Sequence, residues 1–251
     1  MAGRRLGQHF LARRSILERI AAAACRFPDR PVVEIGPGKG ALTEYLVTKA
    51  SHVHGIEVDQ VLVHYLQEKF RENPRFSVQH ADVLKADLSQ WGPVQVTGNL
   101  PYYITSPIIE RVLAMGSNFL QAVFLVQKEV AERVVAHPGS RDYGFLSVQV
   151  QVYAEPKYLF TVPPDAFRPP PKVDSAVIEL TPRSTAVTED PKGLVQFAGL
   201  CFHQKRKMLR NNLSGSFRNE AIDAQPEARL RAEQLTVAQL ADLRDRILKY
   251  S

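Results

Sequence analysis

The stretch VVEIGPGKG at positions 32–40 decides the fold. Its apolar start, ending in Ile35, is typical of a buried strand, and the glycines that follow favour a tight turn. The next segment, ALTEYLVTKA at 41–50, is amphipathic and predicts a helix. A buried strand, a glycine turn and a helix together form one unit of an α/β fold.

The same alternation continues on both sides of this stretch. Short apolar runs predict further strands at 52–57, 76–80, 93–98 and 122–127. Segments of helical periodicity lie at 15–25, 60–71 and 128–137. Strands that alternate with helices imply right-handed crossovers and therefore a mostly parallel sheet.

The pattern changes after Pro138-Gly139. Residues 145–153 alternate apolar and polar side chains, and 173–180 follow a proline-rich turn. We expect these two segments to be a strand pair at one edge of the sheet, with the last strand antiparallel.

A break in composition at 182–185 separates this region from a helical one. Helices are expected at 194–213, 228–230 and 237–250. Residues 1–182 carry a net charge of +2 and residues 183–251 a net charge of +4. We therefore expect an α/β domain at 1–182 and a small basic helical domain at 183–251.

Composition excludes several classes of protein. The 251 residues are 45% hydrophobic with a net charge of +6, which excludes global disorder. No apolar run approaches the length of roughly 18 residues that a membrane-spanning helix needs. Cys25 and Cys201 cannot form a disulfide framework, and neither stands at metal-ligand spacing. We expect a reducing, cytoplasmic location and no metal.

Residues suited to a nucleoside stand where the predicted strands end. In an open α/β sheet, ligands bind beyond the carboxyl ends of the strands. Glycines such as Gly36 and Gly38 allow close backbone approach, Glu57 suits a ribose diol, and Asp82 can accept from the amine of an adenine. The turn at 36–41 also fits a dinucleotide fingerprint, with Glu57 as its acid, so the glycines alone do not decide the ligand.

The tetrad Asn99-Leu100-Pro101-Tyr102 favours methyl transfer to an aromatic amine over pyridine-nucleotide chemistry. The lone pair of an adenine N6 amine is delocalised into the ring and is a poor nucleophile. The Asn99 side-chain oxygen and a carbonyl of Leu100 or Pro101 could accept both N6 hydrogens and aim the lone pair. Pro101 stiffens the turn, and Tyr102 offers a face to a flipped base. The alternative is that the tetrad is only a turn.

In this order, the motifs resemble the ribosomal RNA small-subunit adenine dimethyltransferases of the KsgA and Dim-one type, which use S-adenosylmethionine. The resemblance covers nearly the whole chain. It is carried by GQHFL at 7–11, VEIGPG at 33–38, Glu57, Asp82, the tetrad at 99–102, QKEVA at 127–131, Tyr143-Gly144, FRPPPKVDS at 167–175, KRKML at 205–209 and Asn212-Leu213.

The resemblance implies a class I methyltransferase, a Rossmann-like fold with a seven-stranded, mostly parallel sheet and a small all-α C-terminal domain. It also implies N6-dimethylation of two adjacent adenosines in a hairpin near the 3′ end of 16S rRNA, in a pre-assembled small ribosomal subunit. The implied cofactor contacts are His9, Leu11, Gly36, Gly38, Glu57, Asp82, Val83 and Asn99. Nothing in the sequence indicates oligomers, and we expect a monomer.

Two residues leave alternatives open. Phe167 resembles the aromatic residue that sandwiches the target base opposite Tyr102, and the alternative is a core aromatic beside a proline turn. The family usually has asparagine where this chain has His9. An imidazole can still donate to the methionine carboxylate of the cofactor, but it is bulkier and it titrates; the alternative is a packing variant.

Two basic stretches, 1–14 and 192–218, contain no acidic residue. We expect them to contact rRNA phosphates with little sequence preference. The alternative is that they are solvated surface. The residues expected to make these contacts are Arg4, Arg5, Arg13, Arg14, Lys205, Arg206, Lys207 and Arg210.

Two other functions fit part of the sequence. A large-subunit rRNA adenine methyltransferase of the macrolide-resistance kind would share the same active site. The segments YGFLSV at 143–148 and FRPPPKVDS at 167–175 resemble the small-subunit type more closely. A non-catalytic rRNA-binding assembly factor, or a transcription factor of this fold, is the other alternative. The intact set of Gly36, Glu57, Asp82 and Asn99 argues against lost catalysis.

Overall fold

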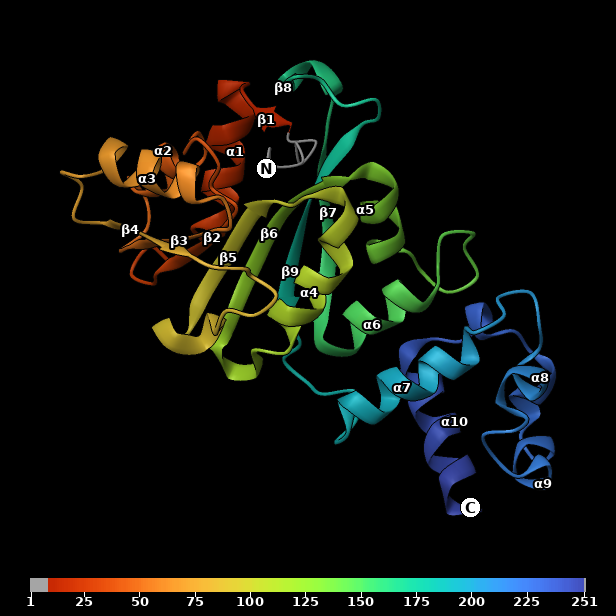
Figure 1. Cartoon of the computed structure of the whole chain (residues 1–251). Coiled ribbons are helices and arrows are strands. Elements are labelled where there is room, and N and C mark those ends of the chain that lie inside the picture. Colours follow the sequence, from red (N-terminus) through yellow and green to blue (C-terminus); the bar gives the residue numbers. More distant parts are fainter. Residues whose placement is uncertain (1–8, 251) are drawn as a thin grey trace. The chain divides into compact units, whose positions relative to one another are not determined.

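The computed structural model describes residues 9–250 (Figure 1). The chain divides into two compact units, one of residues 1–131 and 157–182 and one of residues 132–156 and 183–251. We expected a single boundary at residue 182. The chain does pass between the units there, but residues 132–156 group with the second unit, because a helix in that segment packs against the C-terminal helices.

A seven-stranded sheet, in the order β4-β3-β2-β5-β6-β9-β7, organises the first unit. The five strands from β4 to β6 are parallel, and β9 runs antiparallel to β6. This confirms the predicted mostly parallel sheet with an antiparallel last strand. The strands are β2 (Val32–Ile35), β3 (Val53–Glu57), β4 (Phe76–His80), β5 (Val94–Asn99), β6 (Phe119–Gln127), β7 (Ala154–Val162) and β9 (Ser175–Pro182).

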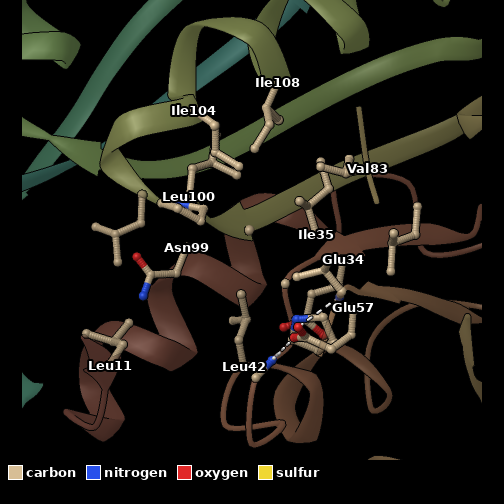
Figure 2. Close-up of a pocket in the computed structure, with 18 of the residues that line it drawn as sticks. Leu11, Glu34, Ile35, Leu42, Glu57, Val83, Asn99, Leu100, Ile104 and Ile108 are labelled. Carbon is tan, nitrogen blue, oxygen red and sulfur yellow. Dashed lines mark hydrogen bonds between the residues drawn. The ribbon is translucent and has the colours of Figure 1, made fainter. Parts of the chain in front are cut away.

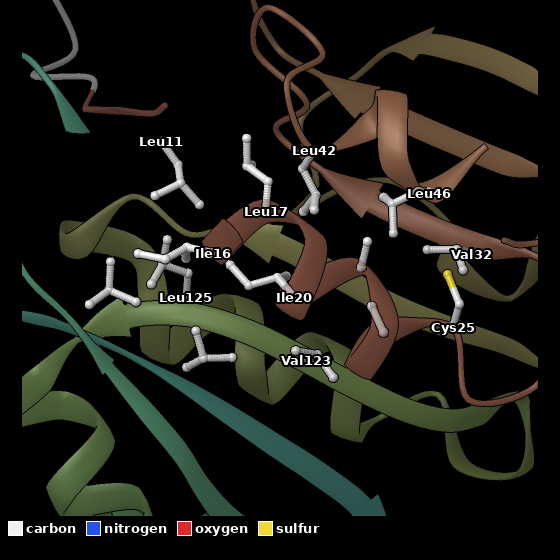
Figure 3. Close-up of a cluster of buried hydrophobic side chains, with 14 of the residues drawn as sticks. Leu11, Ile16, Leu17, Ile20, Cys25, Val32, Leu42, Leu46, Val123 and Leu125 are labelled. Carbon is white, nitrogen blue, oxygen red and sulfur yellow. The ribbon is translucent and has the colours of Figure 1, made fainter. Parts of the chain in front are cut away.

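Helices cover both faces of this sheet (Figure 1). Helix α1 packs through Ile16, Leu17 and Ile20 on Val123 and Leu125 of β6, which forms a continuous apolar core (Figure 3). Helix α4 contacts β6 from the opposite face. The helices that precede or follow the parallel strands are α1 (Arg14–Ala24), α2 (Thr43–Leu46), α3 (Gln60–Lys69), α4 (Thr105–Leu113) and α5 (Lys128–Val135).

The strand order reverses between β2 and β5. The chain continues from β2 to β3 and β4 on one side, and from β5 to β6 on the other, so a crevice is expected at the carboxyl ends of β2 and β5. Gly98 permits the close approach of these strands, because a Cβ there would lie 2.6 Å from the carbonyl oxygen of Ile35.

A short second sheet brings the N-terminal segment to this crevice. Strand β1 (Phe10–Leu11) pairs antiparallel with β8 (Phe167–Arg168). The N–H groups of Ala12 and Arg13 both donate to the carbonyl of Ala166, at 2.8 and 3.3 Å. Residues 9–11 are thereby fixed beside the segment that precedes β9.

The prediction of a strand at 145–153 is wrong, because Phe145–Tyr153 forms helix α6. The hydroxyl of Ser147 accepts from the N–H of Gly144 at 3.1 Å and so closes the first turn. Val148 and Val152, four residues apart, then pack into the apolar cluster of the second unit. Tertiary packing has overridden a period-two pattern of β-favouring residues. The edge strand is β7 instead, which begins after α6.

Residues 183–250 are helical, as predicted, but the helix expected at 194–213 is interrupted. Helix α7 ends at Cys201, and α8 starts only at Leu209. The Asn212 side chain stabilises the intervening turn by donating to the carbonyls of Cys201 and Gln204, at 2.7 and 3.2 Å. The helices of the second unit are α6, α7 (Pro191–Cys201), α8 (Leu209–Leu213), α9 (Asn219–Asp223) and α10 (Val237–Lys249). Among residues 9–250, no helix is long and apolar enough to span a membrane.

Candidate active site

A pocket of about 620 Å³ opens at the carboxyl ends of β2, β3 and β5 (Figure 2). It lies where the reversal of strand order predicts a ligand site. All eight residues expected to contact the cofactor line it, and so do Leu100, Pro101 and Tyr102. The structure thus brings together residues that are spread from position 9 to position 102.

The glycine turn after β2 forms one wall. Gly36 and Gly38 have φ angles of +64° and +58°, in the left-handed region that favours glycine. A Cβ at Gly36 would meet no atom within 4 Å, so the backbone there faces open space. A ligand can therefore approach the main chain at Gly36 more closely than any side chain would allow.

Glu57, at the end of β3, is buried and fixed by three backbone donors. Its Oε2 accepts from the N–H of Gly38 at 3.1 Å, and its Oε1 accepts from the N–H groups of Val58 and Asp59 at 2.9 and 3.0 Å. A carboxylate has about four acceptor positions, so one remains free on Oε2. A ribose hydroxyl can use that position, and a second hydroxyl would have to replace one of the N–H groups.

Asp82 and Val83, which follow β4, offer a polar and an apolar surface side by side. One carboxylate oxygen of Asp82 accepts from the N–H of Leu84 at 3.0 Å, which orients the side chain. Val83 is buried and forms an apolar wall near Ile35 and Ile108 (Figure 2). An apolar slot with one carboxylate at its edge suits a flat base that carries an amine.

Glu34 lines the same pocket, and the sequence reasoning missed it. Burial is the main reason that the pKa of this carboxyl is raised to about 7. A hydrogen bond from the Thr43 hydroxyl, 2.6 Å long, opposes the rise, and the nearby Glu57 adds to it. The signal was present in the sequence as a single acid inside the apolar strand VVEI. Acidic residues are rarely buried, and perturbed pKa values cluster at functional sites.

The tetrad at 99–102 is held in place by several hydrogen bonds. The Asn99 side-chain Nδ2 donates to the carbonyl of His9 at 2.9 Å. The Tyr102 hydroxyl lies 2.8 Å from the hydroxyl of the buried Ser175. The carbonyl of Pro101 accepts from the N–H of Ile104 and from the Thr105 hydroxyl, each at 3.1 Å. These hydrogen bonds give the tetrad a defined orientation.

Phe167 does not line the pocket, although we expected it to stack on a base opposite Tyr102. Its side chain is fully buried in the core that surrounds α1, and its backbone pairs with Leu11. The aromatic ring next to Tyr102 is that of His9, with ring centres 6.4 Å apart and planes inclined by 27°. Phe167 offers no free face to a base here, so we leave it out of the proposed base site.

The basic residues expected to bind RNA differ in their surroundings. Arg4 and Arg5 lie outside the described residues. Four others have acidic or carbonyl partners: Arg13 with Asp165, Arg14 with Glu18, Lys205 with the Arg141 carbonyl and Glu233, and Arg210 with Asp223. Arg206 and Lys207 are exposed in the turn between α7 and α8. Exposed ion pairs are worth about 1 kcal/mol or less, so phosphates can displace them.

Known proteins resemble this chain over most of its length. A family model described as ribosomal RNA adenine dimethylase matches residues 2–249. A protein from Xanthomonas campestris named ribosomal RNA small subunit methyltransferase A is 44% identical to this chain, and the match covers 94% of this chain and 93% of the relative. A protein of the same name from Chlorobium chlorochromatii is 40% identical, and the match covers 96% of this chain and 92% of the relative.

Among the solved structures that share the fold are two crystal structures of RNA methyltransferases. One is a dimethyladenosine transferase from Plasmodium falciparum, with a TM-score of 0.85, 25% identity and coverage of 96% and 98% of the two chains. The other is the 23S rRNA methyltransferase ErmE, with a TM-score of 0.76, 29% identity and coverage of 95% and 99%. The fold is that of the class I methyltransferases, and this chain belongs to the ribosomal RNA adenine dimethylase family.

Proposed function

We propose that this protein acts in the cytoplasm and uses S-adenosylmethionine to dimethylate N6 of two adjacent adenosines in a hairpin near the 3′ end of 16S rRNA. The observation that carries this proposal is the single pocket that joins Glu57 and Asp82 to Asn99. The relatives named small subunit methyltransferase A support the choice of rRNA. The substrate is rRNA in a pre-assembled small ribosomal subunit.

The pocket residues fit S-adenosylmethionine. The free acceptor position of Glu57 suits a ribose hydroxyl, and Asp82 beside Val83 suits the adenine. The open backbone at Gly36 leaves room for the chain that joins the ribose to the methionine group. His9 and Leu11 close the side of the pocket that faces the tetrad. When bound, this cofactor supplies a methyl group already activated by positively charged sulfur.

The Asn99 side chain has its oxygen available for the substrate amine. One N–H of its Nδ2 donates to the His9 carbonyl, and its oxygen can accept a hydrogen from N6. The carbonyl of Pro101 already accepts from two donors, which makes the carbonyl of Leu100 the better second acceptor. Two acceptors favour a pyramidal nitrogen with its lone pair aimed at the methyl group, and no strong general base is required.

Tyr102 provides the face on which the flipped adenine stacks. Its hydroxyl is fixed by Ser175, so the ring loses little further freedom when the base binds. Base–aromatic stacking contributes about 1–3 kcal/mol, enough to offset part of the cost of unstacking the base. Arg206 and Lys207, with the other basic residues, contact rRNA phosphates.

A large-subunit methyltransferase is the second candidate, because the structure resembles ErmE with a TM-score of 0.76. The test is incubation with labelled S-adenosylmethionine and either undermethylated small subunits or large subunits, followed by mapping of the modified nucleotides. We expect N6,N6-dimethyladenosine at two adjacent positions of small-subunit rRNA. Label confined to large-subunit rRNA would favour the second candidate. Transfer to neither, with RNA binding retained, would favour a non-catalytic assembly factor.

A further inference from the structure

His9 is in contact with the Asn99 side chain although ninety positions separate them. The contact is made by the main-chain carbonyl of His9, which accepts from the Asn99 Nδ2 at 2.9 Å. The two orientations of an amide side chain have nearly the same shape, and only hydrogen bonds distinguish them. The position of the His9 carbonyl therefore decides which end of the Asn99 amide points away from it.

The imidazole of His9 is itself anchored. Its Nδ1 lies 2.8 Å from the carbonyl of Pro169. A carbonyl can only accept, so Nδ1 carries the hydrogen, whether the ring is neutral or charged. The ring also lies against Tyr102, and the next two residues pair with β8. Residue 9 is thus held through its ring and through the strand that follows it.

We propose that His9 is a positioning residue for methyl transfer, which holds its own carbonyl where it turns the Asn99 oxygen toward the substrate amine. The proposal rests on the proposed function, because it concerns the same amine. If the His9 carbonyl moved, the Asn99 amide could rotate and present its NH₂ group to N6, and two donors would then face each other. The anchor to Pro169 prevents this in the structure.

Three variants separate this role from a direct contact with the cofactor. The Nδ2 of asparagine stands as many bonds from Cα as the Nδ1 of histidine, so His9→Asn can keep the bond to Pro169. His9→Gln is the matched control, because its amide stands one bond farther out. His9→Ala removes the side chain. All three keep the main-chain carbonyl of residue 9.

The expected result is a loss of turnover with saturating cofactor and rRNA. We expect kcat to fall about 10- to 100-fold in His9→Ala and His9→Gln, and to stay within about threefold of the parent in His9→Asn, since a misplacement of 1 Å can cost about 100-fold. A direct cofactor contact alone would raise the KM for S-adenosylmethionine and leave kcat unchanged. Parental kcat in His9→Ala, or equal rescue by glutamine and asparagine, would overturn the proposal.

Two further measurements keep the proposal testable if a variant folds poorly. In an Asn99→Ala background, His9→Ala should lower kcat no further, whereas multiplied effects would contradict a role through Asn99. In the parental protein, ¹⁵N NMR of the neutral imidazole should show the hydrogen on Nδ1, and a hydrogen on Nε2 alone would refute the anchor. The NMR result does not depend on activity. A parental protein that transfers no methyl group would refute the proposed function itself.

Discussion

Replacing Glu34 with glutamine tests the electrostatics of the pocket. Glutamine keeps the shape of the side chain and an oxygen that can accept from the Thr43 hydroxyl, but it cannot ionise. In the folded protein, burial raises the pKa of Glu34 from its ordinary value of 4.5 to about 7. A rise of this size corresponds to about 3 kcal/mol, since a shift of one pKa unit is worth about 1.4 kcal/mol.

The sign of the effect follows from proton linkage. Because the pKa of Glu34 is higher in the folded state, that state binds more protons than the unfolded chain between pH 4.5 and 7. The free energy of unfolding therefore falls as the pH rises through this window, and above pH 7 the full cost of ionising a buried carboxyl is present. We expect the stability of Glu34→Gln relative to the parent to increase by about 3 kcal/mol between pH 4.5 and pH 8.

The assay is urea unfolding of both proteins at several pH values across this range. Trp91 is the only tryptophan in the chain and lies in the first unit, so its fluorescence reports the unfolding of the unit that contains Glu34. Titrating groups that do not interact with Glu34 behave alike in both proteins and cancel in the difference. A difference that stays constant from pH 4.5 to pH 8 would refute the buried, hard-to-ionise state of Glu34.

Three further changes have defined outcomes. Gly98→Ala places a Cβ 2.6 Å from the Ile35 carbonyl oxygen, so it should lower the unfolding free energy by about 1–3 kcal/mol in urea; an unchanged value would contradict the close approach of β2 and β5. Tyr102→Phe removes the bond to the buried Ser175 hydroxyl and should cost about 1–3 kcal/mol in the same assay, whereas parental stability would show that the bond contributes nothing. Alanine at all three positions 205–207 should weaken rRNA binding and reduce its salt slope by about 2–3, and an unaltered slope would assign these residues to solvated surface.

Local patterns predicted most of the sheet. The stretch at 32–40 forms a strand and a glycine turn as expected, because a buried run and positive φ angles are local requirements. The prediction of a strand at 145–153 failed for a physical reason. Its valines alternate with polar residues, but Val148 and Val152 also stand four apart, and only packing against other helices decides between strand and helix.

The sequence placed those pocket residues that the order of the strands alone brings together. Parallel strands end at one edge of the sheet, so Glu57, Asp82 and Asn99 could be placed there from their positions after predicted strands. The hydrogen bond between Asn99 and His9 and the burial of Phe167 depend on the pairing of β1 with β8. Strands β1 and β8 have only two residues each, which is too short for a pattern of apolar and polar residues to predict their pairing.

The most direct test of the account is Asn99→Ala, measured for turnover and for cofactor affinity in parallel. Methyl transfer to undermethylated small subunits gives kcat, and calorimetry gives the Kd for S-adenosylmethionine. Because the Asn99 oxygen is proposed to act on the substrate amine, we expect kcat to fall about 100- to 1,000-fold while the Kd changes by about threefold or less. Methylation at the parental rate would contradict the account.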